Sequence, residues 1–419
     1  MVVVFVIVAL GVLCLLAGAH WYLWRRLVRD VSAKGGGWRR TGKVLVFALP
    51  GTVVATMITT RAGAPFPVQR VLAWPGYLWL ALLLYLLLAL LVGEAVRPLL
   101  RWALSRRAPE RRVDDASAGT AEPEPEPETE TESEAAAGEA PGARTASRRL
   151  FVARTVAAGA ALAAGGTVAA GAYSVLNGPT LKRVTVPLAK LPRSAHGYRI
   201  AVVSDIHLGA VLGRSHAERI VRTINSAQPD LIAIVGDLVD GTVADLAPAA
   251  EPLRELRARD GSFFVTGNHE YFGDAEEWVD HVRELGVHPL ENARRELPGF
   301  DLAGVNDVQG ESVGEAPDFA KALGDRDTSR ASVLLAHQPV QIHKAVDHGV
   351  DLQLSGHTHG GQMWPAEYLA ALANPTVAGL ERYGDTQLYV TRGAGAWGPP
   401  VRVGAESDVT IVRLASRQA

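Results

Sequence analysis

Residues 198–205 read YRIAVVSD, an apolar run that ends in an aspartate. Four later stretches are also apolar runs followed by polar residues: DLIAIVGD (230–237), SFFVTGNH (262–269), SVLLAHQP (332–339) and DLQLSGH (351–357). Short apolar runs of this kind, separated by amphipathic helical segments, are typical of strands that are buried on both faces of a mostly parallel sheet. The C-terminal part of the chain is therefore predicted to have an α/β fold.

Polar residues of the kind that bind metals stand at the end of each of these runs. In an open α/β sheet the carboxyl ends of the strands meet at one edge, where ligands bind. Taken singly, an aspartate after a strand is usually a helix cap and a Gly-Asn pair is usually a turn. Nine such residues at strand ends favour a shared site instead: Asp205, His207, Asp237, Asp240, Asn268, His269, His337, His357 and His359.

The choice of ligands limits the metal. Cys14 is the only cysteine and lies in an apolar run, so neither a disulfide framework nor a thiolate site can form. In SGHTHGGQ, residues 355–362, two histidines one residue apart stand among glycines and can point into one space. Imidazole, carboxylate and amide oxygen suit Mn, Fe, Zn, Co or Ni and argue against a closed structural zinc site.

The N-terminal part has the character of a membrane protein. Apolar runs at 1–24, about 44–60 and 71–93 have the length that a helix needs to cross about 30 Å of hydrocarbon, which predicts a membrane region with three transmembrane helices over residues 1–100. A cleaved signal peptide is the alternative for the first run, but a basic leading region and a clear cleavage site are missing.

Two further segments connect this region to the α/β part. Residues 101–147 include AEPEPEPETETESEAAAGEAPG and are too acidic and too poor in large apolar side chains to fold, so we expect a disordered linker. Residues 148–178 are a fourth apolar run. With Ser147, Arg148, Arg149 and Phe151 this stretch resembles a twin-arginine signal, and it is predicted to be a fourth transmembrane helix or a signal anchor.

The basic residues between the apolar runs predict the orientation in the membrane. The loop from 25 to 43 carries seven Lys or Arg residues, whereas the loop from 61 to 70 holds only Arg61 and Arg70. By the positive-inside rule the first loop is cytoplasmic, and residues 180–419 are expected outside the cytoplasmic membrane. The formal net charge of −2 gives no indication of nucleic-acid binding.

The order DxH, GDxxD, GNHE, H, GHxH over residues 198–415 resembles the calcineurin-like metallophosphoesterase family. GHTHGGQ (356–362) and RGAGAWGPPVRVG (392–404) are similar to its bacterial membrane-attached branch. The resemblance implies a four-layer α/β/β/α sandwich over residues 180–419, with two divalent metal ions. It also implies hydrolysis of phosphate esters through a metal-bridging hydroxide that attacks phosphorus in line.

Family resemblance also implies a role for each residue of the motifs. Asp205, His207 and His359 would bind one ion, Asn268, His337 and His357 would bind the other, and Asp237 would bridge the two. His269 would act as proton donor or oxyanion stabiliser, oriented by Asp240.

The expected function is thus that of a membrane-anchored, metal-dependent phosphoesterase. Phosphodiesters, pyrophosphates and monoesters all stay open as substrates, and the membrane location modestly favours a lipid- or envelope-linked ester. The alternatives are a transporter or signalling membrane protein with a regulatory metal-binding domain, and a binding module with an inactive site. The strongest apolar run, 71–93, has no charged residue that would mark a translocation path.

Overall fold

The computed structural model describes residues 2–106 and 141–418, which divide into two compact units. One unit comprises Met1–Ala48 and Leu84–Ala164, and the other comprises Leu49–Leu83 and Gly165–Ala419. Helix continues to Arg106 and begins again at Pro141, at the two ends of the predicted acidic linker. The rest of that linker lies outside the described residues.

Long helices make up the N-terminal region: α1 (Val2–Trp24), α2 (Gly37–Arg61), α3 (Phe66–Arg106) and α4 (Pro141–Leu176). Among the described residues, the segments Gly37–Arg61, Phe66–Leu104 and Arg148–Leu176 are long and apolar enough to cross a membrane. They contain the apolar runs predicted from about residue 44, from residue 71 and from residue 148. Residues 2–24 form the helix α1, and its membrane insertion stays a prediction.

A polar cluster connects the end of α1 to α3 within the first unit. Glu94 of α3 pairs with Arg26 at 2.8 Å and accepts a hydrogen bond from the Tyr22 hydroxyl at 2.7 Å, and Arg97 lies 3.4 Å from the same carboxylate. These charges follow directly after the apolar part of α3. They mark where the apolar stretch of that helix ends.

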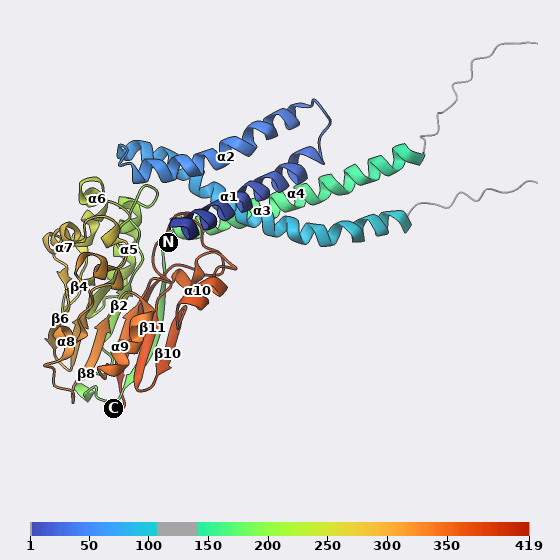
Figure 1. Ribbon diagram of the computed structural model, residues 1–419. Helices are drawn as coiled ribbons and strands as arrows, with labels where there is room; N and C mark the ends of the chain where they lie inside the picture. Colours follow the sequence, from blue (N-terminus) through green and yellow to red (C-terminus); the bar gives the residue numbers. More distant parts are fainter. Residues whose placement is uncertain (1, 107–140, 419) are drawn as a thin grey trace, which may run out of the picture. The chain divides into compact units, whose positions relative to one another are not determined.

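The α/β region contains two six-stranded sheets (Figure 1). The first has the order β1 (Thr180–Leu188), β12 (Asp408–Ser416), β2 (Arg199–Val203), β3 (Leu231–Val235), β4 (Ser262–Val265), β5 (His288–Pro289). The second has the order β10 (Gly379–Tyr383), β11 (Thr386–Val390), β9 (Leu352–Ser355), β8 (Ala331–Leu335), β7 (Phe300–Gly304), β6 (Ala293–Leu297). The strands β2, β3 and β4 are parallel, and so are β7, β8, β9 and β11.

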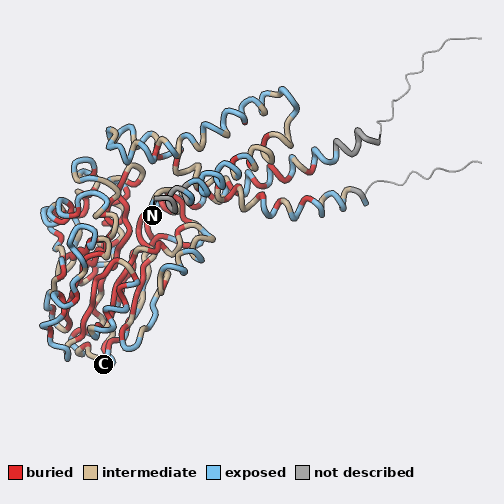
Figure 2. The backbone as a smooth tube through the Cα atoms, in the orientation of Figure 1, coloured by how far each residue is buried: buried red, intermediate tan, exposed pale blue. Residues whose placement is uncertain are grey.

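Alternate side chains of the central strands point to opposite faces and build separate cores. Ile200 and Val202 of β2 belong to one cluster with Val333 and Leu335 of β8, so the two sheets face each other. Ala201 of β2 points the other way, into the core formed with helices on the outer face of the first sheet. Figure 2 shows these strands as buried.

Helices cover both outer faces. The first sheet is covered by α5 (Arg214–Ser226), α6 (Val243–Ala250) and α7 (Ala275–Glu284), and the second by α8 (Phe319–Leu323) and α9 (Ile342–Asp347). The short helix α10 (Glu367–Ala373) contributes no buried residue. The four-layer α/β/β/α arrangement predicted from the sequence is therefore confirmed.

Candidate metal centre

The polar residues singled out in the sequence meet at the carboxyl ends of five strands. Asp205 and His207 follow β2, Asp237 and Asp240 follow β3, and Asn268 and His269 follow β4. From the second sheet, His337 follows β8, and His357 and His359 follow β9. The site thus lies where the two sheets present their parallel strand ends to each other.

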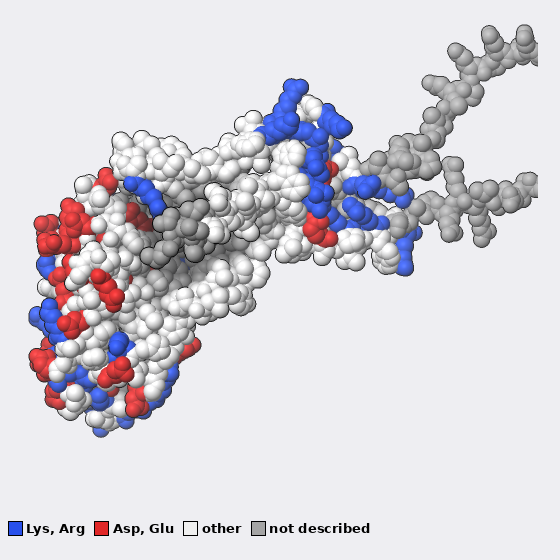
Figure 3. Space-filling view, viewed as in Figure 1, with Lys and Arg blue, Asp and Glu red and all other residues white. Residues whose placement is uncertain are grey.

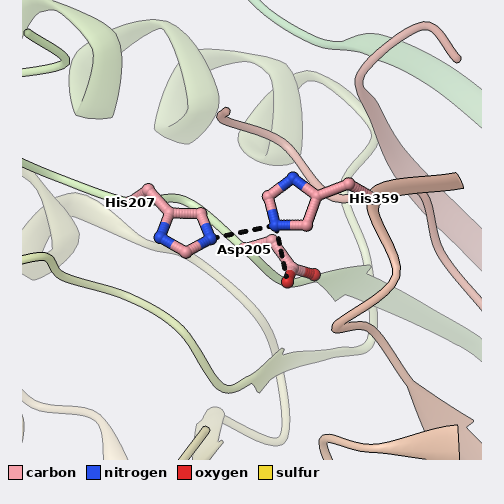
Figure 4. Close-up of side chains that lie close together, drawn as sticks. All are labelled: Asp205, His207 and His359. Carbon is pink, nitrogen blue, oxygen red and sulfur yellow. Dashed lines mark hydrogen bonds and ion pairs between the residues drawn. The ribbon is translucent and has the colours of Figure 1, made fainter. Parts of the chain in front are cut away.

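Asp205, His207 and His359 form one group of possible ligands, shown in Figure 4. The Nε2 atoms of His207 and His359 are 3.0 Å apart, and His359 Nε2 is 3.3 Å from Asp205 Oδ1. All three residues are buried. Three ligand atoms that converge this closely can share one cation.

Asp237, His337 and His357 form a second group. His337 Nε2 lies 3.1 Å from Asp237 Oδ2, and His357 Nδ1 lies 2.9 Å from Asn268 Oδ1. Asp237 Oδ2 is also 3.9 Å from His207 Nε2, and His207, Asp237 and His269 make a third, overlapping group. Asp237 therefore stands between the two sides of the site.

Hydrogen bonds on the far side of two rings show that the site fits a metal. His207 Nδ1 is 2.8 Å from the Asp240 carboxylate, and His337 Nδ1 is 2.8 Å from the Val235 carbonyl. Both partners can only accept, so each Nδ1 carries the proton and a neutral ring keeps its lone pair on Nε2. The Nε2 of His337 is buried, has no hydrogen bond and faces the Asp237 carboxylate. A cation between them would satisfy both groups.

The charges around the rings set which form each histidine takes. Burial lowers the pKa of His357 to about 4 and that of His359 to about 4, so both rings are neutral at neutral pH, as metal ligands must be. Burial also disfavours the charged form of His207, but the carboxylates, chiefly Asp240, raise its pKa to about 9. A bound cation would compete with that proton for the ring.

The backbone at the site takes up a conformation that residues with side chains rarely adopt. Among the described residues, five of the eight residues other than glycine with positive φ lie at the site: Asp205 (52°), His207 (49°), Asp237 (51°), His357 (73°) and His359 (52°). Left-handed backbone costs about 1–3 kcal/mol at a residue with a side chain and collects at functional sites. This concentration marks the same residues that the motifs mark, and no sequence pattern shows it.

The space around Gly356 explains why a glycine precedes the first histidine of GHTH. A Cβ at this position would lie 2.0 Å from Ser204 Oγ and 2.4 Å from Asp205 Oδ2. Because glycine has no Cβ, the backbone can approach closely, and the His357 backbone N–H donates to the Asp205 carboxylate at 3.0 Å. The loop after β9 is thereby tied to the loop after β2.

Two buried charged residues support the loops without belonging to either group of ligands. Glu270 accepts hydrogen bonds from the backbone N–H groups of Asp237, Leu238 and Gly267. Arg402 donates to the carbonyl oxygens of Gly395, His359 and Ala405. Sequence reasoning missed Arg402, because a single arginine in a loop of glycine and proline has no periodic pattern to distinguish it.

His269 occupies a different position from the other rings. Its Nδ1 is 2.7 Å from Asp240 Oδ1, and its backbone N–H donates to Asp237 Oδ1 at 2.9 Å. Its ring makes T-shaped contacts with the rings of Phe272 and Trp397, at centroid distances of 5.0 and 5.7 Å. Phe272 is 67% exposed and Trp397 59% exposed, so apolar side chains reach solvent beside this imidazole.

Comparison with known proteins agrees with this geometry. The family described as "Calcineurin-like phosphoesterase" matches residues 198–361. The chain is 39% identical over 259 residues to the "Transmembrane protein with metallophosphoesterase domain" of Danio rerio, a match covering 58% of this chain and 59% of that protein. It spans less than two thirds of that relative's length.

Two bacterial relatives are matched over almost their whole length. Identity is 34% over 251 residues to the "Uncharacterized metallophosphoesterase" of Aquifex aeolicus, covering 58% of this chain and 95% of that protein. It is 30% over 271 residues to the "Uncharacterized metallophosphoesterase YkuE" of Bacillus subtilis, covering 61% and 94%. With its five motif-bearing loops gathered at the carboxyl ends of strands from both sheets, the chain belongs to the calcineurin-like metallophosphoesterase family.

Proposed function

We propose that this protein is a membrane-anchored phosphoester hydrolase whose site holds two divalent metal ions. The observation that carries the proposal is the overlap of the ligand groups. One group contains Asp205 and another contains His337 and His357, and Asp237 lies between them at 3.1 Å from His337 and 3.9 Å from His207.

The ligands divide between two ions. Asp205, His207 and His359 would hold one ion, Asn268, His337 and His357 would hold the other, and Asp237 would contribute to both. The nitrogen and oxygen donors suit Mn, Fe, Zn, Co or Ni. When bound, such a pair of ions lowers the pKa of water to make a nucleophile at neutral pH and stabilises the charge that develops on a phosphoryl group.

His269 moves the proton in this proposal. The Asp240 carboxylate accepts the N–H at Nδ1, which fixes the orientation of the ring and leaves Nε2 to give or take a proton at the ester oxygen. His207 donates to the same Oδ1 atom. Asp240 thereby positions a ligand and the proton-transfer residue together.

The helices and the rim of the site support a proposed location and substrate class. The three candidate spans support attachment to a membrane, and the Lys and Arg asymmetry of the loops supports an extracytoplasmic site in a multi-pass protein. The exposed rings of Phe272 and Trp397 beside His269 favour an ester with an apolar portion, such as a lipid-linked phosphate or pyrophosphate.

Hydrolysis of bis-p-nitrophenyl phosphate by the full chain in detergent tests the activity. We expect turnover that a chelator abolishes and Mn²⁺ restores, and that Asp237→Asn loses together with bound metal. Asp385→Asn, a substitution at a fully exposed carboxylate, is the matched control and should keep both. Metal-loaded wild-type protein without turnover of this diester, of a monoester or of a pyrophosphate would refute the hydrolase.

A further inference from the structure

Helix α10 presents an apolar face that no described part of the chain covers. None of its residues is buried, and Tyr368, Leu369 and Leu372 are 66%, 69% and 85% exposed. Leu372 lies four residues after Tyr368 and three after Leu369, and residues three or four apart are neighbours on a helix surface, so both side chains adjoin Leu372 in one patch. In Figure 3 the surface over α10 on the visible face is white, without charged side chains.

The chain leading into α10 is tied to a loop that contacts the membrane helices. The Trp364 backbone N–H donates to the Val403 carbonyl at 2.8 Å, and Met363 forms bridges with Val403 and Gly404. The neighbouring Arg402 backbone N–H donates to the carbonyl of Gly171 in α4 at 3.2 Å. A Cβ on Gly171 would lie 2.7 Å from the Arg402 carbonyl oxygen, so the loop approaches the α4 backbone closely.

A second contact joins the same loop to α3. A Cβ on Gly398 would lie 3.8 Å from the ring of Tyr77, and Ala396 packs with Val175 of α4 in a small core. The segment 396–404 therefore rests against two candidate membrane spans, at Tyr77 and near Gly171.

The lengths of the two spans place that segment at a boundary of the hydrocarbon. Tyr77 lies 20 residues before Arg97, and Gly171 lies 17 residues after Arg154. At 1.5 Å per residue these separations are about 30 and about 26 Å, close to the roughly 30 Å thickness of a bilayer's apolar core. With the arginines at one interface, the contacts with the loop 396–404 fall near the other.

We propose that α10 is a membrane-docking helix that inserts Tyr368, Leu369 and Leu372 into the interface of the bilayer spanned by the chain's own helices. Helices with an apolar face lie in this way at the junction of headgroups and acyl chains. Trp364 and Trp397, 47% and 59% exposed, suit the same depth, where tryptophan is enriched. The proposal holds whichever side of the membrane the site faces, and it does not depend on the hydrolase activity.

Site-directed spin labelling tests the docking in the full chain. Cys14 is the only cysteine, so Cys14→Ser provides a background in which Leu369→Cys or Leu372→Cys carries a single nitroxide. Val313→Cys, at another exposed apolar residue of the same region, is the matched control. The protein is reconstituted in phosphatidylcholine nanodiscs, and collisions of each label with oxygen and with a water-soluble nickel chelate are measured.

Oxygen concentrates in hydrocarbon and the nickel chelate stays in water. We expect the ratio of oxygen to nickel collisions at 369 and 372 to exceed that at 313 several-fold. Equal ratios at all three positions would show that α10 stays in water and would overturn the proposal. Exclusion of both reagents at 372 would also overturn it, because the patch would then be covered by protein, such as a second copy of the chain.

Discussion

At the scale of single residues, one carboxylate oxygen of Asp240 accepts hydrogen bonds from two histidines. Its Oδ1 accepts from Nδ1 of His207 at 2.8 Å and from Nδ1 of His269 at 2.7 Å. The two histidines, His207 foremost, hold the pKa of the carboxyl well below its usual range, although burial alone would raise it. The carboxylate is therefore charged at neutral pH and fixes the tautomers of a proposed ligand and of the proposed proton-transfer residue at once.

This geometry predicts that His269 and Asp240 fail in different ways. His269→Ala should keep its metal and lose about 10² to 10⁴-fold in rate, the usual contribution of a general acid or base. Asp240→Asn should lose rate and also bind metal about 10 to 100-fold more weakly, because His207 loses its anionic partner. Metal content by mass spectrometry and turnover on the same preparations separate the two effects.

A third grouping of side chains defines the result that would contradict this assignment. His207, Asp237 and His269 also converge as a possible ligand group. If purified His269→Ala came out depleted of metal while keeping its fold, His269 would have to be counted as a ligand.

Which residues meet at the site could be predicted from the sequence, but how they are held could not. A polar residue after an apolar run is visible in the sequence, which is how Asp205, Asp237 and His337 were identified. Positive φ at Asp205 and His357 is found in two loops, one from each sheet, that are joined by the hydrogen bond from the His357 backbone N–H to the Asp205 carboxylate. The hydrogen bonds of Arg402 to His359 and Gly395 join loops that no local pattern relates to one another.

At the scale of elements, the five strands that carry the site were predictable because each is a continuous apolar run. The edges of the sheets were not. β1 pairs with β12 across more than 200 residues, with Thr180 opposite Asp408, and β12 inserts antiparallel to β2. Strand order depends on such distant pairings and not on local composition, so it could not be assigned from the pattern of apolar runs.

Helix α5 carries a buried histidine that makes stability depend on pH. His216 is buried, and burial, followed by the charge of Arg219, lowers its pKa to about 4. The unfolded chain, with a pKa of about 6.5, binds a proton that the folded chain does not bind between these values. Stability should therefore be lost as the pH falls from about 6.5 to about 4.

His216→Leu should remove this dependence. For His216 alone, linkage gives a loss of about 2 kcal/mol between pH 7.5 and pH 5, or roughly 4 to 8 °C in the midpoint of thermal unfolding. The variant should lose correspondingly less over the same range, since protonation of other groups is common to both proteins. His343→Leu, at an exposed histidine of α9, should behave as the native protein. Parallel pH profiles for native protein and His216→Leu would contradict the prediction.

At the scale of the whole molecule, candidate membrane spans and the proposed catalytic site lie in one chain. Residues 49–83 and 165–419 form a single compact unit, so parts of α2, α3 and α4 belong with the α/β region. If a flexible tether were the only connection, the α/β region would not need to pack against these helices, since a tethered domain can pack independently of its anchor. The contacts of the loop 396–404 with Tyr77 and Gly171 favour a site held at a fixed height above the bilayer.

The side of the membrane on which this site lies is the last prediction. Seven Lys and Arg residues between 25 and 43, against two between 61 and 70, predict a cytoplasmic first loop and an extracytoplasmic location for residues 180–419. Alkaline phosphatase, which is active only outside the cytoplasm, should be active when fused after Ala419 and silent when fused after Ala121. Green fluorescent protein at the same two positions should give the reverse pattern and controls for expression. An active phosphatase at Ala121 with a silent one at Ala419 would invert the topology and place the site in the cytoplasm. A phosphate ester on the outer leaflet would then be out of reach, so the fusions also decide which leaflet supplies a lipid-linked substrate.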